Sequence, residues 1–217
     1  MSTTTQNRVL AEAILPSIGQ MKLVKQAVLV VAGVIALIVA AKISIPMFPS
    51  PVNVTLGTFA VLAVGTSYGP RLGLITIATY TTLGVLGFNV FATTTGFFNG
   101  PLEGIKYVLG GSGGYIAGYV LATVYLGWAA RRGLDKSVET MFGALLVANV
   151  LIYVPGLLWL ANWIVVEGKL NLANFDGLWS QTFAWGLTPY IIGDLLKLAI
   201  AGMLIPAIWK LVGSART

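Results

Sequence analysis

The stretch LVKQAVLVVAGVIALIVAA, residues 23–41, is apolar except for Lys25 and Gln26 near its start. About 20 residues of α-helix are needed to cross the hydrocarbon core of a bilayer. The stretch is too long for the apolar region of a cleaved signal peptide, and the preceding residues 1–21 are largely polar. It therefore predicts a transmembrane helix.

Five further apolar stretches follow, near residues 51–69, 72–92, 115–130, 138–163 and 187–212. Each has roughly the length of a membrane crossing. Together with the first they predict an all-α integral membrane protein with six transmembrane helices. We expect a cytoplasmic N-terminal tail over residues 1–21 and one membrane domain over residues 22–213.

Composition and charge agree with this class. The chain is 57% hydrophobic and 9% charged, with a mean hydropathy of +0.87. Its basic residues lie at the ends of the apolar stretches and form no stripe, which argues against nucleic-acid binding. Cytoplasmic loops carry the excess of Lys and Arg, so we expect both termini in the cytoplasm and a multi-pass protein of the cell membrane. The terminal side carries Arg8, Lys22, Lys25, Arg71, Arg131, Arg132, Lys136, Lys210 and Arg216, against Lys42, Lys106 and Lys169 on the other side.

Several functions are disfavoured by what the chain lacks. It contains no cysteine and no histidine, so the commonest metal ligands and the commonest general base are missing. The segment GGSGGYIAGY, residues 110–119, lacks the lysine–serine pair of a phosphate-binding loop and instead favours close helix packing. We expect no enzyme, no metal site and no cofactor. The long connections 43–55, 92–112 and 163–186 all fall on the outer side, which suits capture of an external solute.

Ionisable residues interrupt the last apolar stretch. Tyr190, Asp194 and Lys197 are spaced i, i+4 and i+7, so a helix places them on one face. An ionisable residue inside a membrane marks a functional site by default. The pair could instead be a structural ion pair, or Lys197 could extend to the membrane surface. The functional interpretation is a polar clamp, in which the carboxylate accepts N–H groups and the ammonium binds a carbonyl, as in a urea-like ligand.

Other candidates come from loops and from small residues. Thr55 and Thr58 follow the proline-rich segment 46–51 and could either cap the next helix or belong to a loop over an outer pocket. Asn99 is a candidate amide for a polar ligand. Ala32 and Ala36 recur at helical spacing in the first stretch, which allows another helix to approach closely. That helix could be internal or could belong to a partner protein.

Three segments together resemble a known family. They are residues 52–92, which begin VNVTLGTFAVL, the glycine-rich 110–119, and DLLK at 194–197. They are similar to BioY, the biotin-specific substrate-binding (S) subunit of energy-coupling factor (ECF) transporters. The resemblance implies the six-helix S-component fold, with biotin bound near the outer face as transported ligand. It also implies two kinds of partner, a transmembrane coupling (T) subunit that docks on Ala32 and Ala36, and two ATPase subunits.

The resemblance further implies roles for particular residues. Asp194 and Lys197 would meet the ureido ring of biotin, beside Tyr190. Asn99, Tyr115, Thr55 and Thr58 would complete the pocket. The resemblance leaves the partner of the ligand carboxylate open; Lys106 and Lys42 are the other outer-side cations nearby, and of these we expect Lys106. Two other classes remain open: an autonomous proton-coupled carrier for biotin or a related vitamin, with Asp194 as the proton site, and a structural membrane protein whose buried ion pair binds no ligand.

Overall fold

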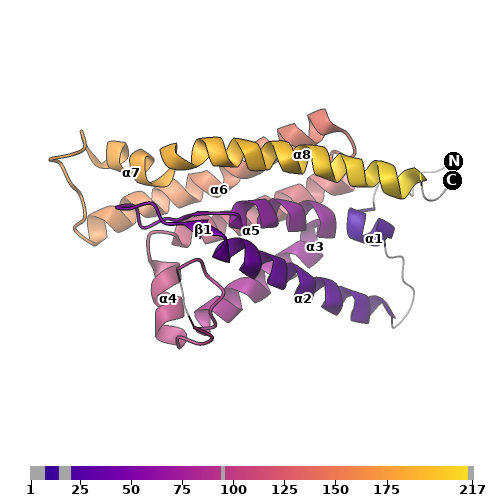
Figure 1. Ribbon diagram of the computed structural model, residues 1–217, viewed down its shortest axis with the longest axis horizontal. Coiled ribbons are helices and arrows are strands. Elements are labelled where there is room, and N and C mark those ends of the chain that lie inside the picture. The colour runs from indigo at the N-terminus through magenta and orange to yellow at the C-terminus, as the bar shows by residue number, and fades with distance from the viewer. Residues whose placement is uncertain (1–7, 15–20, 94–95, 215–217) are drawn as a thin grey trace.

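The structure is a computed structural model that describes residues 8–14, 21–93 and 96–214. It is mostly helical, and its long helices run roughly along one axis (Figure 1). The described elements, in chain order, are α1 (Leu10–Ile14), α2 (Met21–Lys42), β1 (Ser44–Ile45), β2 (Val54–Thr55), α3 (Gly57–Val85), α4 (Pro101–Leu109), α5 (Gly113–Arg131), α6 (Val138–Val166), α7 (Leu178–Gly186), the 3₁₀ turn η1 (Thr188–Tyr190) and α8 (Ile191–Ser214).

The helical membrane protein expected from the sequence is confirmed at this level. Within the described residues, four segments are long and apolar enough to cross a membrane: Met21–Lys42, Gly57–Val85, Val138–Val166 and Leu178–Gly213. The first and third begin and end close to the predicted stretches. The apolar side chains that face outward on these segments are those that a lipid environment accepts.

Helix α3 contains a sharp reversal. Gly69 has φ +77°, outside the helical region, and Pro70 follows it directly. A Cβ built on Gly73 would lie 3.7 Å from the Cα of Gly65. Eight residues of continuous helix would instead separate these positions by about 12 Å. The chain therefore doubles back at Gly69 into two short antiparallel helices, at the position where the sequence GPRLG predicts a turn.

Glycines of α5 bring this helix into close contact with α6. A Cβ on Gly118 would lie 2.6 Å from the Cα of Ile152, and one on Gly114 would lie 3.0 Å from the Cα of Gly156. Only a residue without a side chain allows such an approach. This geometry agrees with the packing role predicted for the glycine-rich segment, and it makes α5 the central helix between α3 and α6.

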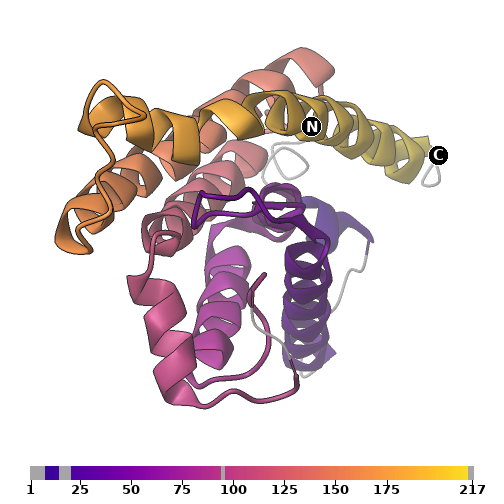
Figure 2. The same cartoon turned by 60° about the vertical axis from the view of Figure 1, so that its left-hand side comes forward.

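The three long connections gather at one end of the molecule, which we call the loop end: residues 43–56, residues 86–93 and 96–112 with α4, and residues 167–190 with α7 (Figure 1). Figure 2 brings this end forward and shows the 43–56 loop crossing between α8 and α2. Helix α1 and the C-terminal end of α8 lie at the opposite end, which we call the α1 end. Helix α1 falls inside the predicted tail; its Leu10 is buried, and so is Val9 directly before it.

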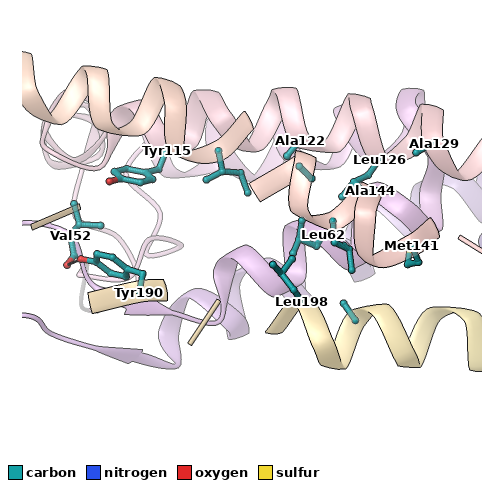
Figure 3. Close-up of a cluster of buried hydrophobic side chains, with 14 of the residues drawn as sticks. Val52, Leu62, Tyr115, Ala122, Leu126, Ala129, Met141, Ala144, Tyr190 and Leu198 are labelled. Atoms are coloured by element: carbon teal, nitrogen blue, oxygen red, sulfur yellow. Dashed lines mark hydrogen bonds between the residues drawn. The ribbon is translucent and has the colours of Figure 1, made fainter. Parts of the chain in front are cut away.

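The packed interior lies between the two ends. Leu62, Ala122, Leu126 and Met141 belong to one apolar cluster formed by α3, α5, α6 and α8. Figure 3 shows this cluster continuing toward the loop end, where the rings of Tyr115 and Tyr190 lie on either side of Val52. Polar aromatic groups thus replace aliphatic ones on moving along the core toward the loops.

Candidate ligand-binding site

A cavity lies beneath the loop end. Its empty volume is about 780 Å³ when the open space at its mouth is included. The lining comes from α2, the 43–56 loop, α3, the connection that contains α4, α5, α6, the α7–η1 segment and α8. The lining residues include Leu37, Val52, Asn53, Thr55, Thr58, Tyr80, Phe91, Tyr107, Tyr115, Tyr119, Ile152, Tyr153, Tyr190, Asp194 and Lys197.

The ion pair predicted from the sequence lies in this lining. Lys197 Nζ donates to Asp194 Oδ1 at 2.8 Å and to Thr58 Oγ1 at 3.1 Å. Tyr153 donates its hydroxyl proton to Asp194 Oδ2 at 2.5 Å. Asp194 is 5% exposed and Lys197 8% exposed. The two charges are therefore removed from solvent, and each is held by the other and by a hydroxyl group.

This arrangement retains donor and acceptor capacity for a ligand. An ammonium group has three N–H donors, and two of them are used in the bonds to Asp194 and Thr58. Each carboxylate oxygen accepts one bond and has a further lone pair. The pair can thus present acceptors and a donor side by side to one small polar group. In a buried ion pair with a purely structural role, the folded state is more stable when other groups of the protein bond the remaining donors and acceptors.

Tyr190 has a different local role from the one suggested by helical spacing. Its hydroxyl donates to the carbonyl of Val52 at 2.6 Å. Ser50 Oγ donates to the carbonyl of Trp185 at 2.8 Å and accepts the N–H of Val52 at 3.0 Å. Residues 50–52 are thereby attached to the α7–η1 segment across the top of the cavity. Tyr190 contributes its ring to the lining, while its hydroxyl holds the loop.

Tyr115 and Thr55 likewise combine lining with local support. Tyr115 donates to the carbonyl of Gly186 at 2.7 Å, and its ring meets that of Tyr153 edge-on at 5.9 Å between centroids. Thr55 Oγ1 accepts the N–H of Gly57 at 3.0 Å, a local turn bond of the kind hydroxyl side chains make before a helix. Thr55 thus supports the turn just before α3, whose N-cap residue Leu56 has no side-chain cap, whereas Thr58 bonds the lysine of the ion pair.

Asn99 and Lys106 lie outside the lining. Asn99 is exposed, and its backbone N–H donates to the carbonyl of Gly87 at 2.7 Å. Lys106 pairs with Glu103 at 2.7 Å on the surface of α4, with its side chain 60% exposed. The structure therefore does not bring these two residues together with Asp194 and Lys197.

Ala32 and Ala36 lie on an outward face of α2, and both are exposed. The exposed side chains around them are apolar, among them Val28, Ile35 and Val39. Of the two alternatives that the alanine spacing leaves open, an internal contact is wrong for these two positions, because no described helix covers them. Ala40, one turn further on, is buried.

Sequence reasoning missed most of the aromatic wall. Tyr153 is the main example, since a single tyrosine in an apolar helix gives no periodic signal. Tyr115 and Tyr119 are spaced i and i+4 on α5, so their shared face could have been found. Tyr80, Phe91 and Tyr107 meet only through the fold, with Phe91 stacked on Tyr107 at 4.3 Å between centroids.

A second groove borders the same carboxylate from another side. It has an empty volume of about 710 Å³ including its opening and lies between α6 and α8. Its lining is mainly aliphatic, with Asn149, Tyr153 and Asp194 as its polar members. Tyr153 and Asp194 therefore form part of the wall between the two spaces.

Fold and cavity together define a helical membrane protein with a buried polar site beneath the loops at one end. The chain belongs to the BioY family, whose model matches residues 7–214, so the resemblance seen in the sequence is confirmed. The chain is 33% identical over 163 residues to the probable biotin transporter BioY of Pyrococcus horikoshii, covering 75% of this chain and 83% of that protein. It is 30% identical over 186 residues to the biotin transporter BioY of Thermotoga maritima, covering 84% and 96%.

A solved structure shows the same fold. It is the crystal structure of the S-component for biotin from an ECF-type ABC transporter, with a TM-score of 0.67. The alignment covers 89% of this chain and 95% of that one, at 19% sequence identity. At this identity the likeness concerns the fold. The transporters among the relatives agree with the expectation that the chain is not an enzyme.

Proposed function

We propose that this protein is the biotin-binding S subunit of an ECF transporter and mediates biotin uptake across the cell membrane. The observation that carries the proposal is the Asp194–Lys197 pair within a cavity at the loop end. The relatives named as biotin transporters support the choice of ligand. The S-component fold supports the transporter class.

The chemistry of the ligand matches the pair. A ureido ring has two N–H donors and one carbonyl acceptor. The carboxylate of Asp194 can accept N–H groups, while Lys197 can donate to the carbonyl. Hydrogen bonds to charged groups are each worth about 1.5 to 3 kcal/mol. Tyr153 and Thr58 hold both charges in place, so little side-chain entropy is lost when the ring binds.

The remaining lining suits the rest of the molecule. Aromatic and aliphatic walls bury the fused ring, and apolar burial contributes about 25 cal/mol per Å². Tyr115, Thr55 and the Tyr190 ring form part of these walls. Asn99 as a pocket residue and Lys106 as the cation for the ligand carboxylate stay predictions, and neither lies in the lining of the cavity.

We further propose six membrane crossings, with both termini in the cytoplasm. The reversal at Gly69 supports this count, because it divides α3 into two antiparallel helices, and α5 adds a sixth helix. The basic residues at the α1 end support the orientation. Residues 1–21 would then be the cytoplasmic tail and residues 22–213 the membrane domain.

The proposed partners are a T subunit and two ATPase subunits. The exposed alanines of α2 support a docking face, since small residues on a membrane helix permit close approach of another helix. The chain itself would supply ligand binding and the partners ATP hydrolysis. Movement of the 43–56 loop, followed by reorientation of the whole subunit, would release biotin on the inner side.

Isothermal titration of the purified protein in detergent tests the proposal. We expect biotin to bind tightest and dethiobiotin more weakly, since it keeps the ureido ring but lacks the second ring that fills the apolar walls. Riboflavin and thiamine should give no binding heat. Absence of binding heat with biotin, in protein that is monodisperse and helical, would favour the structural-protein alternative.

The autonomous carrier predicts a different result. If Asp194 is a proton site, biotin uptake into vesicles without ATPase subunits should follow an imposed pH gradient. Lys197 already supplies a counter-charge to Asp194 within the chain, so we expect no such dependence. Uptake that requires the ATPase subunits and ignores the gradient supports the S-subunit proposal.

A further inference from the structure

A second polar cavity lies at the α1 end, opposite the ligand site. Its empty volume is about 1490 Å³ including its opening. Four parts of the chain enclose it: the residues at α1, the start of α2, the α3 segment at and beyond the Gly69 reversal, and the end of α5. Its lining residues are Arg8, Ala11, Glu12, Lys22, Lys25, Gln26, Leu29, Tyr68, Arg71, Leu72, Ile75 and Arg131.

The charge of this lining is strongly unbalanced. Five residues in it are cationic and one, Glu12, is acidic, which gives a formal charge of +4. Both carboxylate oxygens of Glu12 already have partners: Oε1 accepts from Arg131 Nη2 at 2.8 Å, and Oε2 accepts the N–H of Val9 at 3.4 Å. The acid therefore positions Arg131 and α1, and the cavity as a whole attracts anions.

The fold directs these cations to one place. A Cβ on Gly69 would lie 3.6 Å from Nε and Nη2 of Arg131, so the guanidinium packs directly on the reversal of α3. Arg71 follows two residues later, and Lys22 and Lys25 lie on the first turns of α2. Charges that only set topology can be scattered over a membrane surface. Here they converge on one concave lining.

An apolar wall accompanies the charges. Leu29, Leu72 and Ile75 line the same cavity and belong to helices long enough to enter the bilayer. The cavity thus offers cations at its rim and aliphatic side chains along the membrane helices. A free phosphate ion uses only the first of these features. A phospholipid uses both, since its phosphate is joined through glycerol to acyl chains.

From this combination we propose that the α1-end cavity binds the phosphate headgroup of an anionic phospholipid of the adjoining leaflet. Basic pockets between membrane helices are suited to such headgroups, and each cation near an anionic membrane surface contributes about 1 kcal/mol. The inference rests on the membrane assignment and is independent of the ligand proposed for the loop end. The bound lipid would fix α1 against α2 and α3.

The test is a binding titration of the purified full chain in non-ionic detergent. The probes are dioctanoyl phosphatidylglycerol, dioctanoyl phosphatidylcholine with the same acyl chains, and inorganic phosphate. We expect saturable binding of phosphatidylglycerol, at least 10-fold weaker binding of phosphatidylcholine, and equally weak binding of phosphate. Equal binding of the two lipids would overturn the charge argument. If inorganic phosphate binds as tightly as phosphatidylglycerol, the ligand is a soluble anion and the proposal of a lipid ligand is overturned.

Two double variants locate the site. Lys22→Gln with Arg71→Gln removes two exposed cations of the lining and should weaken phosphatidylglycerol binding roughly 30-fold. Arg132→Gln with Lys210→Gln removes two exposed cations outside the lining and should change it less than 2-fold. Similar weakening in both variants would show diffuse surface attraction and overturn the proposal. Unchanged helicity and an unchanged biotin dissociation constant establish that the variants are folded.

Discussion

Opposite charges inside a membrane helix are costly, at about 2.5 to 3.5 kcal/mol for each ion on insertion scales. Asp194 and Lys197 reduce that cost through their own contact and through the hydroxyls of Tyr153 and Thr58. Removal of one member leaves the other buried without its counter-charge. This makes conservative substitutions more informative here than truncations.

Asp194→Asn keeps the shape of the side chain and removes its charge. We expect biotin binding to weaken by about 1.5 to 3 kcal/mol, the scale of hydrogen bonds to charged groups, as measured by isothermal titration. Asp176→Asn, an exposed acid at the loop end, is the matched control and should leave the dissociation constant unchanged. An unchanged constant in Asp194→Asn would remove this residue from the site.

At the scale of single residues, the sequence predicted the Asp194–Lys197 pair but not the hydrogen bonds that hold it in place. Asp194 and Lys197 are conspicuous because ionisable residues are rare in apolar helices. Tyr153 is not conspicuous, since a tyrosine is common near membrane surfaces and its partner lies 41 residues away. Thr58 was found as a candidate hydroxyl, but its contact with Lys197 depends on how α3 and α8 pack.

At the scale of elements, the reversal of α3 depends on one backbone conformation. Gly69→Ala places a side chain at φ +77°, where Cβ also approaches Val9 Cγ1 at 3.1 Å. We expect a loss of stability of at least about 1 kcal/mol, seen as a lower midpoint of thermal unfolding. Gly143→Ala in α6 meets no neighbouring atom within 4 Å and should be neutral or stabilising. Equal midpoints for the two variants would contradict the strained reversal.

The connection between α5 and α6 contains a buried acid. Asp135 is 1% exposed, and Trp209 Nε1 donates to its Oδ2 at 2.5 Å. Burial raises the pKa of Asp135 from its ordinary value to about 6, against smaller lowering effects of the Trp209 bond and Lys136. Because the folded-state pKa is raised, its stabilising contribution is present at low pH and declines as the pH rises through about 6.

Asp135→Asn should therefore remove part of the pH dependence of stability. We expect the difference in unfolding midpoint, variant minus wild type, to increase between pH 5 and pH 7.5. Thermal unfolding followed by circular dichroism measures it in both proteins at each pH. Parallel curves for wild type and variant would show that Asp135 does not titrate in this range.

The ends of a helix were predictable where the length of an apolar stretch determines them. The first apolar stretch and α2 differ by only a few residues at either end, and the GPRLG turn falls on the reversal of α3. Helices α4 and α7 were not predicted, because each is short and lies in a connection rich in glycine and polar residues. Pro101 at the start of α4 was an available signal, since proline favours the first turn of a helix.

At the scale of the whole molecule, the two ends differ in the side chains that they gather. The loop end contains the aromatic cavity, while the α1 end gathers basic side chains. The sequence predicts this division from the lengths of the connections and the placement of Lys and Arg. It could not predict which aromatic residues enclose the cavity, because these come from α3, α4, α5, α6, the η1 turn and the loop before α4, and meet only after packing.

Docking of the coupling subunit should depend on the exposed face of α2. Ala32→Leu with Ala36→Leu adds bulk where no described helix packs, so biotin binding should change less than 2-fold. Biotin uptake by cells that contain the T and ATPase subunits should fall strongly, because the helices can no longer approach closely. Ala117→Leu, at an exposed position of α5, is the size-matched control. Loss of biotin binding in the α2 variant would contradict a role of this face in docking alone.

A structure of the protein with biotin bound tests the central claim most directly. We predict that a ureido nitrogen lies within hydrogen-bonding distance, about 2.7 to 3.2 Å, of an oxygen of Asp194, with the ring carbonyl facing Lys197 Nζ. A ring that binds elsewhere in the chain, or that enters the cavity while the two charged side chains contact only each other, would contradict the account.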